Sequence, residues 1–435
     1  MRSQRHRRLH ALRHLVRLAS RGHGLGSRCA LLVADADWVY WLLSRAGWSC
    51  IPVILDEIKI AAMTHLERFL AVMEYRPVDR GVNWDTGVWP ETQERWAVEG
   101  LDPLSLHWDW SAGEPTLGLD PREHIAFNGW PIPLFDEEVL EEDEQTQVYR
   151  DERGRVRRRF KPDSAGRIRT VMDQYLKFPV TNEADWREVK KRYDPTCPQR
   201  YEPGWRTLRV EGWCNRDHPL AFAPLAHTKG FYWIARELMG TEGVSFGWYD
   251  QPNLMHDIME FWADFLIEAA RPILENTTVE FVVLSEDLAM KTGPLIGPEL
   301  YRRYVLPRLE RTARFLKSHG VRYLAVDTDG NPEVLIPMMM DVGVDVLWPL
   351  ERAADQDPLR LRRTFGRRLR LWGGVDKREL ARGPEAIDAH LRAMAPLIEE
   401  GGFIPTVDHS VPPDVSWPNF RHYLDSKLKL LHGEL

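Results

Sequence analysis

The sequence is poor in cysteine, and its four cysteines are widely spaced. Cys29, Cys50, Cys197 and Cys214 form no C-x-x-C pair, so neither a thiolate zinc site nor a disulfide framework is indicated. The sequence also lacks any apolar run close to the roughly 18 residues of a transmembrane helix. These absences are typical of a soluble, cytoplasmic protein that does not act in a membrane.

An excess of positive charge is absent as well. The formal net charge is −7 at pH 7, which favours solubility and argues against a surface that binds nucleic acid. Of the 435 residues, 43% are hydrophobic, enough to bury one large core or two cores of ordinary size. The composition therefore predicts a globular chain of the size of an enzyme.

The first 62 residues differ from the rest. Residues 1–28 contain eight arginines and no acidic residue. The apolar stretch that follows is interrupted by Asp35 and Asp37, which is unlike a secretory signal. We interpret residues 1–62 as a disordered extension upstream of the folded domain, with a targeting segment or a folded extension as alternatives.

From Met63 onward, apolar strands alternate with amphipathic helices. The strands are near-continuous apolar runs, which indicates burial on both faces and therefore a parallel sheet. They cover residues 81–85, 220–228, 279–287, 321–329, 344–351, 369–376 and 402–409. This alternation, without a G-x-G-x-x-G turn, favours a single barrel over two doubly wound domains. We predict an α/β fold in which residues 63–435 form a (β/α)8 TIM barrel.

One stretch breaks this rhythm. Residues 141–160, "EEDEQTQVYRDERGRVRRRF", alternate polar and apolar side chains around a turn at Asp151–Gly154, which predicts an inserted β-hairpin. The turn is followed by several arginines that could form an anion site. We favour a solvated face balanced by Glu141, Glu142 and Glu144.

Titratable side chains stop seven of the predicted strands. In a (β/α)8 barrel, the C-terminal strand ends and the loops after them form the active-site face. A single such residue would usually cap a helix, but doubled carboxylates followed by histidine or lysine exceed what capping requires. These residues are Asp85, His227, Glu286, Asp287, Asp327, Asp329, Glu351, Asp376, Asp408 and His409.

Asp327 and Asp329 are the most informative pair. They alternate with Thr328, so on an extended backbone both carboxylates leave the same face. Three interpretations are open. The pair holds, with His409, a metal that prefers oxygen and imidazole ligands. It binds a neutral or cationic substrate, with one aspartate as a general base whose pKa the other raises. Or it is a hydrogen-bonded scaffold.

Several segments resemble the uroporphyrinogen decarboxylase superfamily. They are "MTHLERFLAVMEYRPVDR", "EDLAMKTGPLIGPELYRRYVLPRLERTARFLKSHG", "WGGVDKRELARGPEAI" and "GGFIPTVDHSVPPDVSWPNFRHYL". The resemblance spans Met63 to the C-terminus and implies a (β/α)8 barrel with its pocket at the strand C-termini. The superfamily contains tetrapyrrole decarboxylases and zinc- and corrinoid-dependent methyltransferases.

The decarboxylase branch resembles this chain least after the first strand. There the family uses a "MRQAGR"-type run, whose arginines hold the porphyrinogen carboxylates by bidentate pairing. In this chain the same place reads "NWDTGVWPETQERW", with Asp85 and Glu91 and no arginine before Arg95. An acidic rim would repel a polyanion, so uroporphyrinogen itself is disfavoured as the substrate.

The methyltransferase branch resembles this chain more closely. In that branch an H-x-C pair, at the place of "LAVDTDG", and a later cysteine hold a zinc ion that activates a thiol. Here the pair is Asp327 and Asp329, and the later place falls within "VDHSVPP", which offers Asp408 and His409. The spacing is kept, while the ligand atoms change from soft sulfur to hard oxygen.

The resemblance implies an enzyme that transfers or removes a methyl group, with a corrinoid protein or a methylated small substrate. The alternatives are a carboxy-lyase acting on a tetrapyrrole or another carboxylated ring compound, and a non-catalytic corrinoid- or tetrapyrrole-binding protein. The expected partners are a small-molecule substrate and a corrinoid protein, with a homodimer as an open alternative. A divalent metal, or a corrinoid carried by a partner protein, are the cofactor alternatives.

We predict three groups of site residues. The catalytic residues are Asp327, Asp329, Glu286 and Asp287. The substrate-binding residues are Asp85, His227, Lys291, Asn331, Asp376 and Trp348. A metal ion, if one binds, would be held by Asp327, Asp329 and His409.

Overall fold

The computed structural model describes residues 62–102, 114–161, 173–222 and 229–435. Thr64–Leu435 form one compact unit. The extension predicted for residues 1–62 lies, apart from its last residue, outside the described part of the chain and stays a prediction. Within the described ranges, no helix is both long and apolar enough to cross a membrane.

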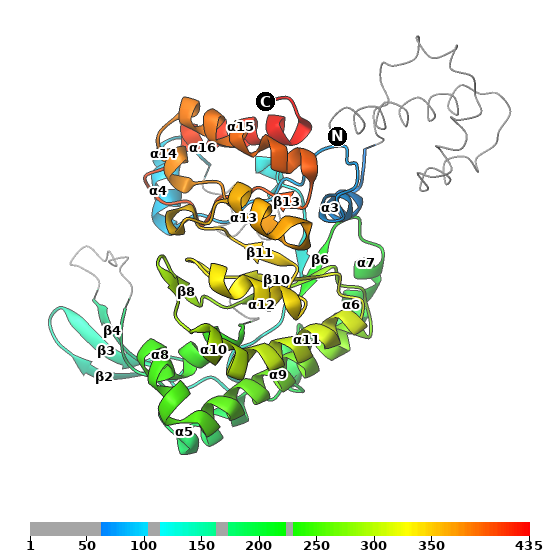
Figure 1. The fold of residues 1–435 in the computed structure, drawn as a ribbon. Helices are drawn as coiled ribbons and strands as arrows, with labels where there is room; N and C mark the ends of the chain where they lie inside the picture. The colour runs from blue at the N-terminus through cyan, green and yellow to red at the C-terminus, as the bar shows by residue number, and fades with distance from the viewer. Residues whose placement is uncertain (1–61, 103–113, 162–172, 223–228) are drawn as a thin grey trace, which may run out of the picture. The chain divides into compact units, whose positions relative to one another are not determined.

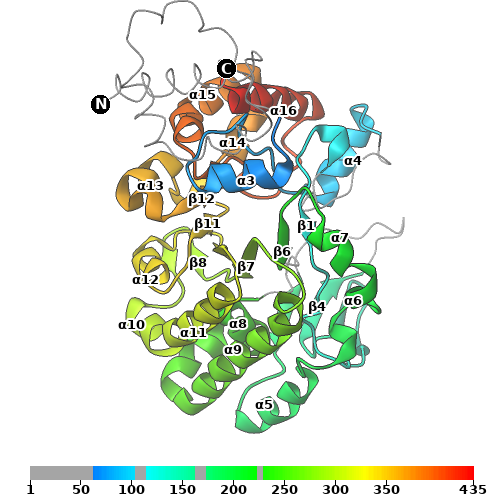
Figure 2. The same cartoon turned by 90° about the vertical axis from the view of Figure 1, so that its right-hand side faces the viewer.

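A curled parallel sheet of seven strands forms the centre of this unit, in the order β1-β6-β7-β10-β11-β12-β13. The strands are β1 (Glu123–His124), β6 (Leu220–Phe222), β7 (Phe281–Ser285), β10 (Tyr323–Asp327), β11 (Val346–Trp348), β12 (Arg370–Trp372) and β13 (Phe403–Ile404). Helices flank the strands in both views (Figures 1 and 2). The arrangement is that of a (β/α)8 barrel, as predicted.

Side chains along the strands alternate between the barrel interior and the helix layer. On β10, Tyr323 and Ala325 join the apolar cluster that fills the barrel. Leu324 and Val326 instead join the cluster formed with the surrounding helices. Because both faces are buried, the strands appear in the sequence as continuous apolar runs.

From β6 onward, helices alternate with the strands of the sheet in chain order. The longer ones are α4 (Pro90–Val98), α8 (Phe231–Asp250), α9 (Pro252–Leu274), α11 (Leu306–Ser318), α13 (Pro358–Phe365), α15 (Pro384–Glu400) and α16 (Trp417–His432). The shorter ones are α5 (Glu183–Val189), α6 (Trp205–Leu208), α7 (Val210–Cys214), α10 (Pro298–Leu300), α12 (Ile336–Asp341) and α14 (Lys377–Ala381).

Helix α3 (His65–Met73) closes the N-terminal end of the barrel. It begins with a capping box, in which Thr64 and Glu67 bond each other's backbone N–H groups. Its Phe69 ring lies 5.2 Å from the Trp84 ring and 5.9 Å from that of Tyr323, the first residue of β10. The barrel is therefore filled by aromatic side chains at this end, and the opposite end remains for a site.

The closing position of the barrel differs from the prediction. Residues 81–85, predicted as a strand, form no regular strand, and β1 was not predicted because it has only two polar residues. The segment is nevertheless held at both ends of the sheet. Asp120 N, near β1, donates to the Asn83 carbonyl at 2.8 Å. Val88 pairs with Val411, beyond β13.

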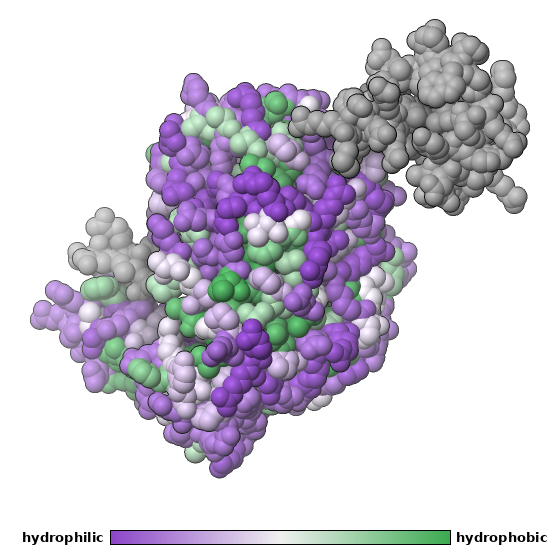
Figure 3. Space-filling model, viewed as in Figure 1, coloured by the Kyte–Doolittle hydropathy of each residue, from purple (hydrophilic) through white to green (hydrophobic). Residues whose placement is uncertain are grey.

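The predicted hairpin is part of a larger antiparallel sheet in the order β2-β3-β4-β5. Its strands are β2 (Glu138–Glu142), β3 (Thr146–Arg150), β4 (Val156–Phe160) and β5 (Gln174–Lys177). The predicted turn at Asp151–Gly154 connects β3 and β4. Figure 3 shows both hydrophilic and apolar residues on the visible face of this insert. Its exposed apolar side chains are Val139, Leu140, Phe160, Tyr175 and Leu176.

The arginines after the turn differ from the expected solvated face. Arg155 is buried and pairs with Asp151 at 2.7 Å and with Glu237 of α8 at 2.9 Å. Arg153 also reaches Glu237, at 3.1 Å. These contacts attach the insert to α8, because the carboxylates that neutralise the arginines lie in the turn itself and on the helix.

Candidate active site

Two predicted site residues meet where β10 and β11 end. Asp327 is the last residue of β10 and is in register with Ser285 of β7 and Trp348 of β11. It shares its face with Tyr323 and Ala325, so its carboxyl group is directed to the inner side of the barrel. Ser285 Oγ donates a hydrogen bond to Asp327 Oδ2 at 2.9 Å. We call this end of the barrel the mouth.

The acidity of Asp327 is strongly changed at this position. Burial and, after it, the nearby carboxylate of Asp329 together raise the pKa of its carboxyl group to about 8, against the Ser285 hydrogen bond. Asp327 therefore carries a proton at neutral pH. A protonated carboxyl group at a barrel mouth can donate a proton to a bound molecule.

Asp329 forms the second part of the mouth. Its Oδ2 lies 3.4 Å from His409 Nε2, which comes from the loop after β13. The hydrogen bond with Asp329 raises the pKa of His409, although burial opposes this. The ring of Trp89, just before α4, stacks on that of His409 at 5.9 Å and 17°. Trp89 is 45% exposed, so this group borders open solvent.

The turn after Asp329 is held by a close backbone contact. Gly330 has a φ of +74°, and a Cβ atom there would lie 2.5 Å from the Ala289 carbonyl oxygen. Its N–H donates to Glu351 Oε2 at 3.2 Å, and Glu351 Oε1 accepts from Lys377 Nζ at 3.4 Å. The strand end that carries both aspartates is thus fastened to the loops after β11 and β12.

Asp408 holds two of these loops together. Its carboxylate is buried and accepts from the backbone N–H groups of Arg352 at 2.8 Å and Lys377 at 3.1 Å. Burial raises its pKa, and the Lys377 ammonium opposes that change. The neighbouring His409 is consequently the residue of this pair that reaches the mouth.

The structure assigns Asp85 to the barrel wall rather than to substrate binding. Its carboxylate is buried and bonds Lys427 Nζ at 2.6 Å, Tyr423 OH at 2.8 Å and Val407 N at 2.9 Å. Lys427 is fully buried as well. The pair joins the start of the barrel to α16, and no exposed oxygen is left for a ligand.

Glu286, predicted to be catalytic, is fully buried at the start of α8. It accepts hydrogen bonds from the N–H groups of Phe231 at 3.0 Å and Tyr232 at 2.7 Å. Burial raises its pKa to about 7 against these hydrogen bonds. A Cβ atom at Gly230 would lie 2.2 Å from its carboxyl carbon. The geometry therefore assigns Glu286 to capping α8 rather than to contact with a substrate.

The other predicted residues divide between the mouth and structural roles. Asp287 pairs with Arg236 of α8 and raises the pKa of Asp327, so its charge lies near the mouth. Asp376 caps α14 and pairs with Arg378 at 2.7 Å.

Three substrate-binding predictions remain. Asn331 accepts from Glu333 N at 3.0 Å, a bond that orders the turn after β10. Lys291 is exposed between the short strands β8 (Ala289–Met290) and β9 (Gly293–Pro294). His227 lies outside the described residues.

Three residues at the barrel interior or mouth were missed by the sequence analysis. Trp89 and Ser285 were not predicted because the prediction was based on titratable side chains at strand ends, and neither residue is titratable. His124 lies on the unpredicted β1, with its ring edge-on to Phe281 at 6.4 Å. The polar two-residue strand offered no apolar run by which His124 could have been recognised.

The arrangement does not fit a metal ion. In the described ranges, no group of three histidine, cysteine, aspartate or glutamate side chains is placed to hold one. Asp329 and His409 bond each other, while Asp327 bonds Ser285 and carries a proton. The chemistry below is therefore assigned to the side chains alone.

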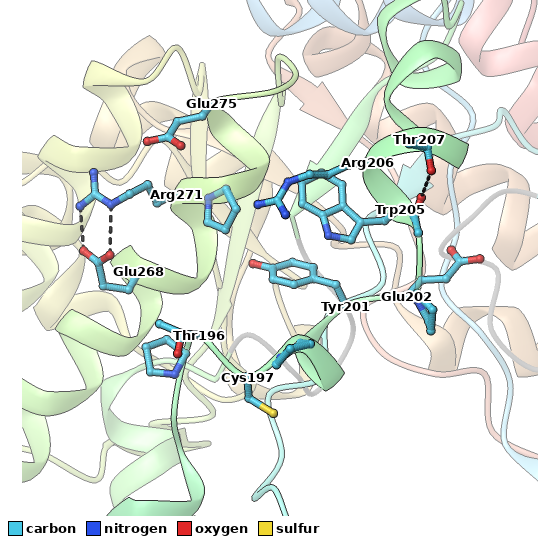
Figure 4. A pocket seen from close by; sticks show the side chains of 15 residues that line it. Thr196, Cys197, Tyr201, Glu202, Trp205, Arg206, Thr207, Glu268, Arg271 and Glu275 are labelled. Atoms are coloured by element: carbon cyan, nitrogen blue, oxygen red, sulfur yellow. Dashed lines mark hydrogen bonds and ion pairs between the residues drawn. The ribbon is translucent and has the colours of Figure 1, made fainter.

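A separate cavity of about 580 Å3 lies outside the barrel. In Figure 4, Glu268 and Arg271 of α9 stand on one side, and Tyr201, Trp205 and Arg206 on the other. No residue of the mouth lines it. Glu268 is paired with Arg271 at 2.7 Å.

Comparisons with known proteins agree with the geometry of the barrel. The uroporphyrinogen decarboxylase family model matches residues 234–427. A methyltransferase from Methanosarcina mazei is similar in structure, with a TM-score of 0.51, 15% identity, and coverage of 84% of this chain and 98% of the other. At this identity the likeness concerns the fold.

A B12-independent methionine synthase from Shewanella sp. W3-18-1 gives a TM-score of 0.33 at 15% identity, covering 50% of this chain and 62% of the other, and supports no further conclusion. A search among curated proteins finds no match.

Proposed function

Because the uroporphyrinogen decarboxylase family model matches residues 234–427 of this chain, we propose that it is an enzyme that transfers or removes a methyl group at the mouth of its barrel. The observation that carries the proposal is the pairing of Asp329 with His409 at 3.4 Å beside a protonated Asp327. The resemblance of the sequence implies that these residues occupy the places at which the methyltransferases of the superfamily hold their zinc ion. In this chain those places offer acid–base groups.

Asp327 is the proton donor in this proposal. When a methyl group leaves an oxygen, nitrogen or sulfur atom, that atom gains electron density and must take up a proton. The Asp327 carboxyl group, with a pKa of about 8, holds a proton at neutral pH and can deliver it. Ser285 fixes one of its oxygens, which leaves the other to face the bound molecule.

Asp329, His409 and Trp89 would bind the substrate. The side chains of Asp329 and His409 are 38% and 30% exposed, so both can contact a molecule in the mouth. Trp89 offers an exposed ring beside them. The methyl acceptor would be a corrinoid carried by a partner protein, which supplies a nucleophilic metal centre from outside this chain.

The test uses purified full-length protein with reduced cobalamin as the acceptor and a panel of methylated phenols, amines and thiols. Methylcobalamin formation, followed by absorbance, is expected with at least one donor class. The Asp327→Asn variant should lose activity by roughly 10²–10⁴-fold. Asp341→Asn, at an exposed position on α12, is the matched control and should keep it. Failure of every donor, or full activity of Asp327→Asn, would contradict the proposal.

A carboxy-lyase is the second candidate, favoured by the same protonated Asp327. Loss of carbon dioxide leaves a carbanion that must be protonated, and this carboxyl group could do so. Release of carbon dioxide from a porphyrinogen or another carboxylated ring compound, without methyl transfer, would favour this reaction. Tight binding of a corrinoid or tetrapyrrole without turnover would indicate a binding protein.

A further inference from the structure

Lys229 is a fully buried lysine that the proposed reaction does not use. It forms a bridge with Ser285 at the end of β7, and α8 begins two residues later. Trp262 Nε1 donates to its carbonyl oxygen at 2.8 Å, which fixes its backbone. Its Nζ atom is buried and has no hydrogen-bond partner among the described residues. An unsatisfied ammonium group at such a position is costly.

The surroundings of Lys229 are aromatic and cationic. Its Nζ lies 3.5 Å from the centre of the Trp130 ring, and the Arg153 guanidinium lies 3.2 Å from the same centre. Glu237 is nearby but already accepts from Arg153 at 3.1 Å and Arg155 at 2.9 Å. Burial lowers the pKa of Lys229 to about 7, although Glu237 opposes this. A large share of the amine is therefore neutral and nucleophilic near neutral pH.

Three arginines and one glutamate act on the charge of Lys229. Arg153, Arg155 and Arg200 lower its pKa, and Glu237 raises it. Arg200 is fully buried and donates to backbone carbonyl oxygens, such as that of Arg192 at 2.8 Å. Arg153 also pairs with Glu152, and Arg155 with Asp151. A protonated Lys229 is repelled by the three guanidinium groups, whereas an anion at its Nζ is attracted by them.

We propose that Lys229 is a carbamylation site, where carbon dioxide adds to the buried amine. The nitrogen lone pair attacks the carbon of carbon dioxide, an N–C bond forms, and one C=O π bond becomes a carboxylate. The amine loses a proton to solvent, and no atom is oxidised or reduced. Carbon dioxide is small and uncharged, so it can enter a space that a hydrated anion cannot. The carbamate carboxylate is attracted by the arginines and strengthens the attachment of the insert to α8.

A second buried lysine provides an internal control. Lys427 is fully buried as well, but its Nζ bonds Asp85 Oδ2 at 2.6 Å and the Trp84 carbonyl at 2.9 Å. The ion pair and hydrogen bonds satisfy its ammonium form, so it should not react. The two lysines therefore differ in pairing and not in burial.

The test traps the adduct on the intact full-length protein. The protein is equilibrated with ¹³C-bicarbonate or in carbon-dioxide-free buffer of equal ionic strength, alkylated with triethyloxonium, digested, and analysed by mass spectrometry. Lys229 should carry an isotope-labelled ethoxycarbonyl group only in the first sample, and Lys427 in neither. At a fixed, subsaturating concentration of dissolved carbon dioxide, the trapped fraction should rise by more than about tenfold between pH 6 and pH 8, because forming the carbamate from the ammonium form releases two protons.

A second measurement avoids dependence on trapping. The ¹³C NMR spectrum of the folded protein should show a carbamate signal that is absent from Lys229→Met. Two results would overturn the proposal: no adduct on Lys229 at saturating carbon dioxide with the protein folded by circular dichroism, or equal labelling of Lys229 and Lys427. Because neither readout uses the proposed methyl transfer, the two proposals fail independently.

Discussion

Replacing Asp327 with asparagine should make the protein more stable while removing most of its activity. Asparagine keeps the size of the side chain and an oxygen that can accept from Ser285, but it has no ionisable group. The pKa of Asp327 is raised from 3.8 to about 8 in the folded state. The folded chain therefore binds this proton more tightly than the unfolded chain, and wild-type stability falls as the pH rises between these two values.

The expected gain in stability of Asp327→Asn follows from the pKa shift of Asp327. At pH 7 the folded carboxyl group keeps its proton, whereas the unfolded one is ionised, because pH 7 lies about three units above its ordinary pKa of 3.8. At about 1.4 kcal/mol per unit, the upper limit of the gain is about 4 kcal/mol, and water at the open mouth reduces it to about 1–3 kcal/mol. The gain should vanish below about pH 4 and level off above about pH 8.

Urea denaturation at pH 4, 7 and 9 would measure this dependence on wild type and variant. Asp376→Asn is the control, because the pKa of Asp376 is shifted in the opposite direction to that of Asp327. Pairing with Arg378 and the cap of α14 lower the pKa of Asp376, although burial opposes them. Its contribution is therefore present above the ordinary pKa and is lost as the pH falls. The control variant should be less stable than wild type at pH 7 and 9, and equal to it in strong acid.

Two outcomes would refute this reasoning. If Asp327→Asn were less stable than wild type at pH 9, Asp327 would be a structural acceptor rather than a strained acid. If its stability changed in parallel with wild type at every pH, the carboxyl group would titrate normally and could not hold a proton at neutral pH. A destabilised variant with full methyl-transfer activity would also remove Asp327 from the chemistry.

Three further predictions concern the mouth, the barrel wall and the N-terminus. His409→Gln should lower the free energy of unfolding by less than about 1 kcal/mol. Because the Asp329 pair raises the pKa of His409, this difference in urea denaturation should be full below about pH 6.5 and disappear as the pH rises through the folded pKa. Lys427→Met should lower the unfolding free energy by about 3–5 kcal/mol, because it leaves Asp85 buried and unpaired; a melting temperature near wild type would contradict this. A chain that starts at Met63 should melt at the temperature of the full chain, since α3 has its own capping box; a large drop would show that residues 1–62 support the barrel.

The barrel could be predicted because burial of a strand on both faces appears in the sequence as a continuous apolar run. Residues 281–285 and 323–327 are apolar on both faces, and the structure has β7 and β10 at these positions. The exception is informative. The segment 81–85 alternates like a strand but closes the barrel through single hydrogen bonds, while β1 pairs with β6 through only Glu123 and His124. A two-residue strand lacks the repetition on which a pattern depends.

The candidate site was predicted less completely. The sequence shows that a carboxylate ends a strand, but it does not show which side chain that carboxylate contacts in the folded chain. The spacing of Asp327 and Asp329 predicted that the two carboxyl groups share a face, and in the structure Asp329 is near enough to raise the pKa of Asp327. Asp85 ends its segment in the same way, yet its partner Lys427 stands 342 residues later. Glu286 turns to the N-terminus of α8, where Gly230 leaves room for it.

The sequence by itself determined the alternation of buried strands and helices, and with it the barrel and the end at which a site can form. These properties depend on side-chain periodicity over a few neighbouring residues, which any strand or helix must satisfy locally. Only the tertiary structure decided which acids are neutralised, which cap a helix and which remain at the mouth. That choice depends on partners far away in the chain, as Asp329 with His409 and Arg155 with Glu237 show.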